Sequence, residues 1–373
     1  MKKKSGFTMV ELLVAIAITM VALAAAVLAF RDSTRANANV TQNADMSDNM
    51  RAGLNLIVQD LIQTGTGIPT GGISIPNTIN AAGCNVGGRV NRPPASLNLV
   101  FQGPNAANVG CNVILPAIEP GNGLGPTVTS PDGTSGPATD VTTIMYADNT
   151  LLVKKAINGA ACPNGSIAPN GLTITFDINC VVIGGAGIPV NSGDLLMIYN
   201  ANQPNGILQT VTSVAGETLS FAAGDAFNLN GRTTTETNGT IRQLQNLTGG
   251  VPNGTYPPTT ATRVWMITYF LFVPPTDTAH PQLMREVNFN APQPVAETLE
   301  NLQFAYNFAD GTVPAPSNQF TVPATDNENQ IRSVNVYMGA RSTSRAALSK
   351  DYTRSNLATQ VALRSMAYFN TYK

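Results

Sequence analysis

Hydrophobic residues at the start of the chain form one unbroken block. From Leu12 to Phe30 there are 19 residues without a charge, and residues 7–30 contain neither Pro nor Gly. A helix of about 20 residues covers the roughly 30 Å hydrocarbon core of a bilayer, so this block is predicted to cross a membrane. Three lysines at positions 2–4 precede it. Positive charge collects on the cytoplasmic side of membranes, which places the N-terminus in the cytoplasm and the rest of the chain outside.

After Phe30 the pattern changes to one apolar face of a helix. Residues 31–63 contain no Pro, and apolar or small residues recur there at spacings of three and four, the period of an amphipathic helix. Gly53 lowers the helix propensity by about 1 kcal/mol. Gly65 and Pro69 are predicted to end a single helix over 7–63. The predicted buried face is Val40, Ala44, Ser47, Met50, Leu54, Ile57 and Leu61, and the predicted exposed face includes Asn43, Asp45, Asp48 and Arg51.

Strand-like segments dominate the remainder. The segment 263–273 is the most hydrophobic and is predicted to be a central strand, with 282–290 as its hairpin partner. Residues 295–301 are predicted to form a short helix or turn, and 357–369 a strand or helix. The other predicted strands are 97–101, 141–146, 151–155, 172–176, 181–183, 195–200, 207–214, 218–221, 302–308 and 331–341. The segments predicted as loops are 65–137, apart from 97–101, and 224–260. A long helix followed by many strands indicates an α+β fold.

Composition narrows the function classes. Charged residues are only 12% of the chain and the net charge is −1, whereas a nucleic-acid-binding domain shows a basic stripe. No Gly-Lys dipeptide occurs, so there is no P-loop. His280 is the only histidine, which excludes a metal site with two histidine ligands and means that any Ser-His-Asp triad would have to use His280. We therefore expect that the chain is not an enzyme and that it binds no cofactor, metal or nucleic acid. An anchored hydrolase that uses His280 is a remote alternative.

Three smaller features also have simple interpretations. His280 lies before a proline and is expected at a surface turn. The acidic segment around Asp326 and Glu328 lacks the spacing of a calcium loop and is expected to be a solvated turn. One strand carries four aromatic side chains that we expect in the core: Trp265, Tyr269, Phe270 and Phe272.

One acid interrupts the apolar block. An ionised Glu11 inside the membrane costs up to a few kcal/mol, less near the interface. Its side chain either reaches the cytoplasmic headgroups or meets a positive partner when the helix leaves the lipid. A secretory signal cleaved near the small residues 22–26 is a further alternative, but it leaves both Glu11 and the Gly6–Phe7 junction unexplained.

Residues 1–11, Met-Lys-Lys-Lys-Ser-Gly-Phe-Thr-Met-Val-Glu, followed by the apolar helix, resemble the class III signal of type IV prepilins. The resemblance implies cleavage by prepilin peptidase between Gly6 and Phe7 and N-methylation of Phe7. It also implies that Glu11 attracts the N-terminal amine of a neighbouring subunit during assembly. The implied fold is the type IV pilin fold, a long helix packed on an antiparallel sheet. The implied regions are a leader at 1–6, a transmembrane and assembly helix at 7–30, its amphipathic continuation at 31–64 and an extracytoplasmic β-rich region at 65–373.

Other segments resemble W-type minor pilins, a branch related to the J-type pseudopilins of type II secretion. These segments are 42–65, 193–214, 284–308, 331–341 and 357–364; residues 66–140 and 224–260 show no family pattern. The resemblance implies a minor pilin that is first anchored in the inner membrane and is then incorporated into an extracellular pilus, near its tip. Its implied partners are major and minor pilins and an assembly platform with a separate ATPase. A type II secretion pseudopilin and a pilin-anchored adhesin remain alternatives.

The four cysteines all follow the apolar block. An even number of cysteines in an oxidising compartment favours two disulfides, and three pairings are possible. Sequential pairing, Cys84 with Cys111 and Cys162 with Cys180, closes the shortest loops. Free buried thiols are the alternative.

Overall fold

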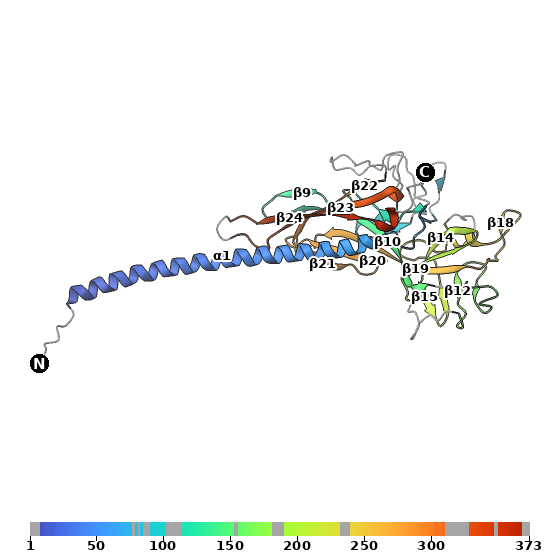
Figure 1. The fold of residues 1–373 in the computed structure, drawn as a ribbon, viewed down its shortest axis with the longest axis horizontal. Helices are drawn as coiled ribbons and strands as arrows, with labels where there is room; N and C mark the ends of the chain where they lie inside the picture. Colours follow the sequence, from blue (N-terminus) through green and yellow to red (C-terminus); the bar gives the residue numbers. More distant parts are fainter. Residues whose placement is uncertain are drawn as a thin grey trace.

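One long helix projects from a body made of strands (Figure 1). The computed structural model describes residues 8–76, 79–80, 83–84, 90–101, 114–152, 156–180, 190–231, 239–309, 328–346 and 350–367. Helix α1 (Met9–Gln63) has 55 residues, a length of about 80 Å at 1.5 Å per residue. The predicted α+β architecture, a long N-terminal helix followed by a sheet-rich region, is confirmed and is consistent with the type IV pilin fold.

The strands within the described residues form three larger sheets and four two-stranded ribbons. The nine-stranded sheet contains β1 (Ile73–Ser74), β6 (Ile114–Leu115), β7 (Ile118–Glu119), β10 (Thr142–Leu152), β13 (Leu195–Asn200), β14 (Gln203–Thr210), β19 (Thr260–Phe272), β20 (Gln282–Val287) and β21 (Gln293–Glu297). The four-stranded sheet contains β11 (Ser166–Ile167), β12 (Thr173–Thr175), β15 (Ser213–Ala215) and β16 (Thr218–Ser220). The three-stranded sheet contains β22 (Leu299–Phe308), β23 (Ile331–Arg341) and β24 (Arg354–Ala362).

The ribbons and short helices complete the chain. The ribbons are β2 (Ile79–Asn80) with β3 (Gly83–Cys84), β4 (Asn91–Arg92) with β5 (Leu99–Val100), β8 (Thr127–Thr129) with β9 (Ser135–Ala138), and β17 (Leu247–Thr248) with β18 (Val251–Pro252). The short helices are α2 (Arg364–Ala367) and single 3-10 turns at Ala95–Leu97, Ile241–Leu244 and Glu328–Gln330.

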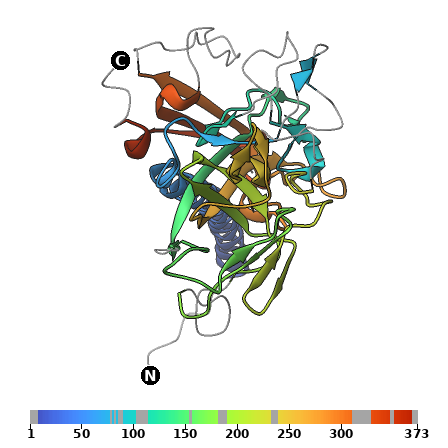
Figure 2. The same cartoon turned by 90° about the vertical axis from the view of Figure 1, so that its right-hand side faces the viewer.

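Strand β19 is the central strand that the sequence predicts. One of its edges pairs with β10, while its other edge pairs with β13 along the first half and with β20 along the second half. The first half therefore belongs to a lobe far from the N-terminus, where the four-stranded sheet covers β13 and β14. The second half belongs to the lobe that holds α1. Viewed along the rod, the three-stranded and four-stranded sheets lie on opposite sides of the body (Figure 2).

The C-terminal part of α1 supplies one side of the main core. Met50, Leu54, Ile57 and Leu61 are buried as predicted, against β10, β21, β23 and β24. The predicted face was wrong at its start, since Val40 is 68% exposed and Ala44 is also exposed. The helical period identifies which face is apolar, but the sheets reach only as far as the turn of Met46. The buried face also includes Gly53 and Asp60, which the pattern did not mark.

The close packing at Gly53 explains a glycine inside a helix. A Cβ at this position would lie 3.0 Å from Leu283 Cδ2 and 3.2 Å from Ala296 Cβ. The helix axis can approach β20 and β21 this closely because the side chain is missing. The propensity cost of about 1 kcal/mol is therefore offset by contact of the helix with the sheet. At the end of α1, Gly65 has a φ of +81°, which confirms the glycine stop signal.

Several strand predictions are confirmed, including 195–200 and 331–341 at their exact ends and the 263–273 and 282–290 hairpin. Of the short helix or turn predicted at 295–301, the helix was wrong, because this segment continues β21, bends at Thr298, where φ is +57°, and begins β22. Pairing with β20 and β23 overrides the weak helical spacing of this segment.

Smaller differences concern loops and strand ends. The strand predicted at 97–101 is a 3-10 turn followed by two paired residues, and the segment 207–214 is divided between β14 and β15. The predicted loop 224–260 contains a 3-10 turn and the β17–β18 ribbon. The strand predicted at 181–183 lies outside the described residues.

Candidate functional site

The first part of α1 is an exposed apolar rod. Met9 is 85% and Phe30 73% exposed, and apolar residues between them point in every direction around the helix. An 18-residue stretch of this helix has a mean hydropathy of 2.8, and none of it is buried. Among the described residues it is the one helix long and apolar enough to cross a membrane. A helix that is hydrophobic on all sides needs lipid or other protein around it, so this segment has the length and composition of a membrane anchor.

Glu11 lies in the first turn of this rod and closes its N-terminal end. The Thr8 backbone N–H donates to Glu11 Oε2 at 2.9 Å, and the Thr8 hydroxyl donates to the same oxygen at 3.0 Å. In return, the Glu11 backbone N–H donates to Thr8 Oγ1 at 3.3 Å. This reciprocal pair is a capping box. It holds the carboxylate at the positive end of the helix dipole, directly beside the backbone nitrogen of Thr8.

This arrangement gives Glu11 a role within a single subunit that the sequence reasoning did not consider. The Thr-x-x-Glu spacing before an apolar run is a sequence signal that would have revealed it. Gly6 and Phe7 lie outside the described residues. The predicted cleavage and methylation at these residues, and the predicted assembly role of Glu11, therefore stay predictions.

A second polar site joins α1 to the sheet. Asp60 is 4% exposed and accepts hydrogen bonds from the Tyr269 hydroxyl on β19 and from the Arg285 guanidinium on β20. The Arg285 Nε–Asp60 Oδ2 distance is 2.7 Å. Burial, followed by the charge of Asp60, raises the pKa of Tyr269, so the phenol stays protonated and donates. This trio fixes the rotation of the helix against the sheet.

The sequence carried a weak signal for this trio. Asp60 falls between Ile57 and Leu61 on the apolar face of the helix, and a charged residue there needs a buried partner. The identity of the partner could not be read from the sequence, because Arg285 is 225 residues away.

The disulfide between Cys162 and Cys180 is present, with the two Cα atoms 6.0 Å apart. Cys111 and the side chain of Cys84 lie outside the described part of the chain, so their pairing stays a prediction. The disulfide joins two loops next to the four-stranded sheet in the lobe far from the N-terminus. A disulfide that closes a loop of this size stabilises the folded state by about 3 kcal/mol.

The remaining candidate residues lie apart from one another. His280 is half-exposed at a turn, and its Nδ1 lies 2.7 Å from Asp277 Oδ2. In the aromatic strand, Tyr269 and Phe270 are buried as predicted, whereas Trp265 and Phe272 are half-buried. Asp326 and the side chain of Glu328 lie outside the described residues.

Comparison with known protein families finds a match at the N-terminal end of the chain. Residues 1–27 match the family model of the prokaryotic N-terminal methylation motif. This motif is that of type IV prepilin-like proteins, and it covers the basic leader, the Gly6–Phe7 junction, Glu11 and most of the apolar block. No curated protein and no solved structure matches the chain.

Proposed function

We propose that this chain is a minor type IV pilin of the W-type, anchored in the inner membrane by the first part of α1 and then inserted near the tip of a pilus. The observation that carries the proposal is the methylation motif over residues 1–27, at the start of an exposed apolar helix with an acid in its first turn. Type IV prepilin-like proteins with this motif are structural subunits, which agrees with a role in assembly.

The proposed maturation begins with prepilin peptidase, which cleaves between Gly6 and Phe7, after which the new amine of Phe7 is methylated. Cleavage removes three lysines and leaves a positive amine one residue before Thr8. The backbone nitrogens of adjacent residues are about 3.5 Å apart. The amine and the Glu11 carboxylate of each subunit therefore lie at nearly the same depth in the membrane.

The proposed driving force for insertion is an exchange of partners at Glu11. In the free subunit its carboxylate accepts two hydrogen bonds from Thr8. In a filament, the amine of a neighbouring subunit would supply an opposite charge in a low-dielectric environment, where Coulomb attraction is much stronger than in water. Each charge also relieves the other's desolvation. While the subunit stays in the membrane before assembly, the capping box supplies hydrogen bonds to the Glu11 carboxylate and holds it at the N-terminal end of the helix.

The proposed partners follow from this cycle. Major and minor pilins surround the rod, and an inner-membrane assembly platform with a separate ATPase supplies the energy for extraction from the lipid. The N-terminus would face the cytoplasm because of the lysines at positions 2–4, and the strands would lie outside.

The test uses full-length chains in a bacterium with type IV pili. Glu11→Gln keeps the size and a hydrogen-bonding end but removes the charge, and Asp45→Asn removes an exposed charge elsewhere on the same helix. We expect the Glu11→Gln chain to be cleaved and methylated, as read by mass spectrometry of its N-terminus, but to be lost from sheared pili. The Asp45→Asn chain should be incorporated like the wild type.

Two outcomes would contradict the proposal. Undiminished incorporation of Glu11→Gln would refute the assembly role of the acid. A mature chain that begins at Met1, or within residues 22–27, would refute processing as a prepilin. Recovery in a type II secretion pseudopilus instead of sheared pili would replace the minor pilin with its pseudopilin alternative.

A further inference from the structure

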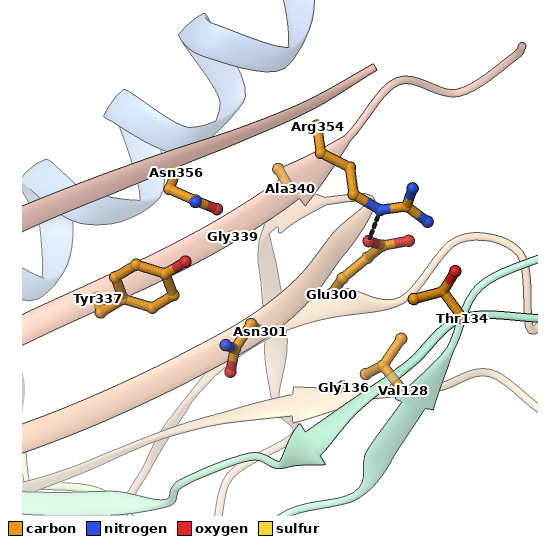
Figure 3. Close-up of a pocket in the computed structure, with 10 residues that line it drawn as sticks. All are labelled: Val128, Thr134, Gly136, Glu300, Asn301, Tyr337, Gly339, Ala340, Arg354 and Asn356. Carbon is orange, nitrogen blue, oxygen red and sulfur yellow. Dashed lines mark hydrogen bonds and ion pairs between the residues drawn. The ribbon is translucent and has the colours of Figure 1, made fainter. Parts of the chain in front are cut away.

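A notch of about 180 Å³ opens on the three-stranded sheet, on the face opposite α1 (Figure 3). Strands β22, β23 and β24 form its floor, and the β8–β9 hairpin forms one wall. The wall is fastened to the floor, since the Gln303 side chain donates to the Ala138 carbonyl at 2.9 Å. Arg354 also donates to Ser130 Oγ at 3.1 Å. These hydrogen bonds hold the hairpin against the sheet, so the notch between them is a fixed part of the fold.

A β-bulge places two neighbouring polar side chains in the notch. Leu299 pairs with Ala340 and Asn301 pairs with Gly339, so Glu300 is an extra residue on β22. In a regular strand, adjacent residues point to opposite faces. The bulge turns Glu300 and Asn301 toward the same cavity, as bulges do beside binding sites.

The floor of the notch depends on a missing side chain. A Cβ at Gly339 would lie 3.2 Å from Asn356 Oδ1, 3.3 Å from Asn301 Cβ and 3.9 Å from Tyr337 Cε1. Gly339 lies inside β23, opposite the bulge, and glycine in a strand often marks a bulge or the close approach of a ligand or another backbone. The space between the two amides and the phenol ring exists because this position has no side chain.

The charges in the notch neutralise one another. Glu300 Oε2 lies 2.8 Å from Arg354 Nε, and Glu300 Oε1 lies 3.0 Å from Nε of the buried Arg341. Arg354 also bonds Asp132 Oδ2 at 2.6 Å, which lowers the pKa of Asp132 to about 2. Of these four groups, Glu300 and Arg354 line the notch and pair with each other, whereas Asp132 and Arg341 lie outside its lining. The charges that line the notch therefore cancel, so the notch favours an uncharged ligand.

We propose that this notch binds one neutral pyranose, as a free sugar or as the end of a glycan. The Asn356 and Asn301 side chains offer amide donors and acceptors, which matches the pattern of adjacent sugar hydroxyls. The Asn301 oxygen already accepts from Gln303 Nε2 at 3.0 Å, so one of its two lone pairs is left for a ligand. The Tyr337 ring offers an apolar surface for the C–H face of the sugar. The volume of about 180 Å³ is smaller than the roughly 300–1,000 Å³ of pockets for drug-sized ligands, which limits the ligand to one ring. This inference does not depend on the proposed role in a pilus, because binding to the notch needs no assembly.

The test measures binding to the full-length chain in a detergent without a sugar headgroup. The probes are methyl β-D-glucopyranoside, methyl β-D-galactopyranoside, methyl α-D-mannopyranoside and the charged sugar glucuronate, detected by saturation-transfer difference NMR. We expect binding of at least one neutral pyranoside. Gly339→Ala, which fills the floor, and Asn356→Ala, which removes an exposed amide, should each weaken it roughly tenfold or more. An array of immobilised glycans that end in the same sugar distinguishes a surface glycan from a free sugar.

The matched control is Asn335→Ala, on the same strand and sheet face as Tyr337 but outside the notch. It should bind like the wild type. If Gly339→Ala does not fold, Asn356→Ala still decides the question. The proposal is overturned if no neutral pyranoside binds at about 10 mM, if only glucuronate binds, or if Asn335→Ala weakens binding as much as Asn356→Ala.

Discussion

Replacing Asp60 by alanine should destabilise the globular region by about 3 kcal/mol. The substitution leaves the Tyr269 hydroxyl without its acceptor, and Tyr269 is completely buried. It also leaves Arg285 without its ion-pair partner. Breaking one side of a buried ion pair costs about 3–5 kcal/mol. Because the Arg285 side chain keeps 25% of its surface exposed, water can solvate part of the guanidinium, so the lower end of this range is expected.

The assay is urea unfolding of the full-length chain in detergent, followed by the fluorescence of Trp265, the only tryptophan of the chain. The control is Asp48→Ala, at an exposed position on the same helix, which should change the stability by less than about 0.5 kcal/mol. In a double-mutant cycle, Arg285→Met should make the loss at Asp60 smaller, because the two residues share one interaction. A loss below about 1 kcal/mol for Asp60→Ala would refute the argument that this trio fixes the helix on the sheet.

Two further substitutions test the packing and the electrostatics of the core. Burial raises the pKa of Glu286 from 4.5 to about 7, so the folded state binds more protons than the unfolded state between these pH values and its stability falls as the pH rises. In the wild type the free energy of unfolding should therefore fall between pH 4.5 and pH 8, by at most about 3 kcal/mol because water screens part of the carboxyl. Glu286→Gln should remove this fall; urea midpoints of the two proteins that change in parallel with pH would contradict the prediction. Gly53→Leu should destabilise by about 2 kcal/mol or more, despite its better helix propensity, because a Cβ there would already lie 3.0 Å from a side chain of the sheet; an unchanged or higher urea midpoint would show that the helix can move away.

Sequence patterns that depend only on nearby residues predicted much of the fold. The long helix, its end at Gly65, the central strand 263–273 and its hairpin all follow from local period, local hydrophobicity and glycine signals. The same is true of the N-terminal motif, because its basic residues, the Gly6–Phe7 junction and Glu11 are neighbours in the chain. The extent of the buried helix face was not predictable in this way, since Val40 has the right spacing but no sheet beside it.

The chain by itself determined the apolar rod, the acid in its first turn and the class of fold, because these features depend on residues that are neighbours in the sequence. Tertiary structure decided which polar residues meet. The ion pair between Asp60 and Arg285, the bulge at Glu300 and the space above Gly339 all depend on strand register and on contacts between distant segments. A charge can be buried only when a partner of opposite charge or a hydrogen-bonding group lies against it, and a missing side chain matters only where another element packs closely. Both conditions are set by the fold.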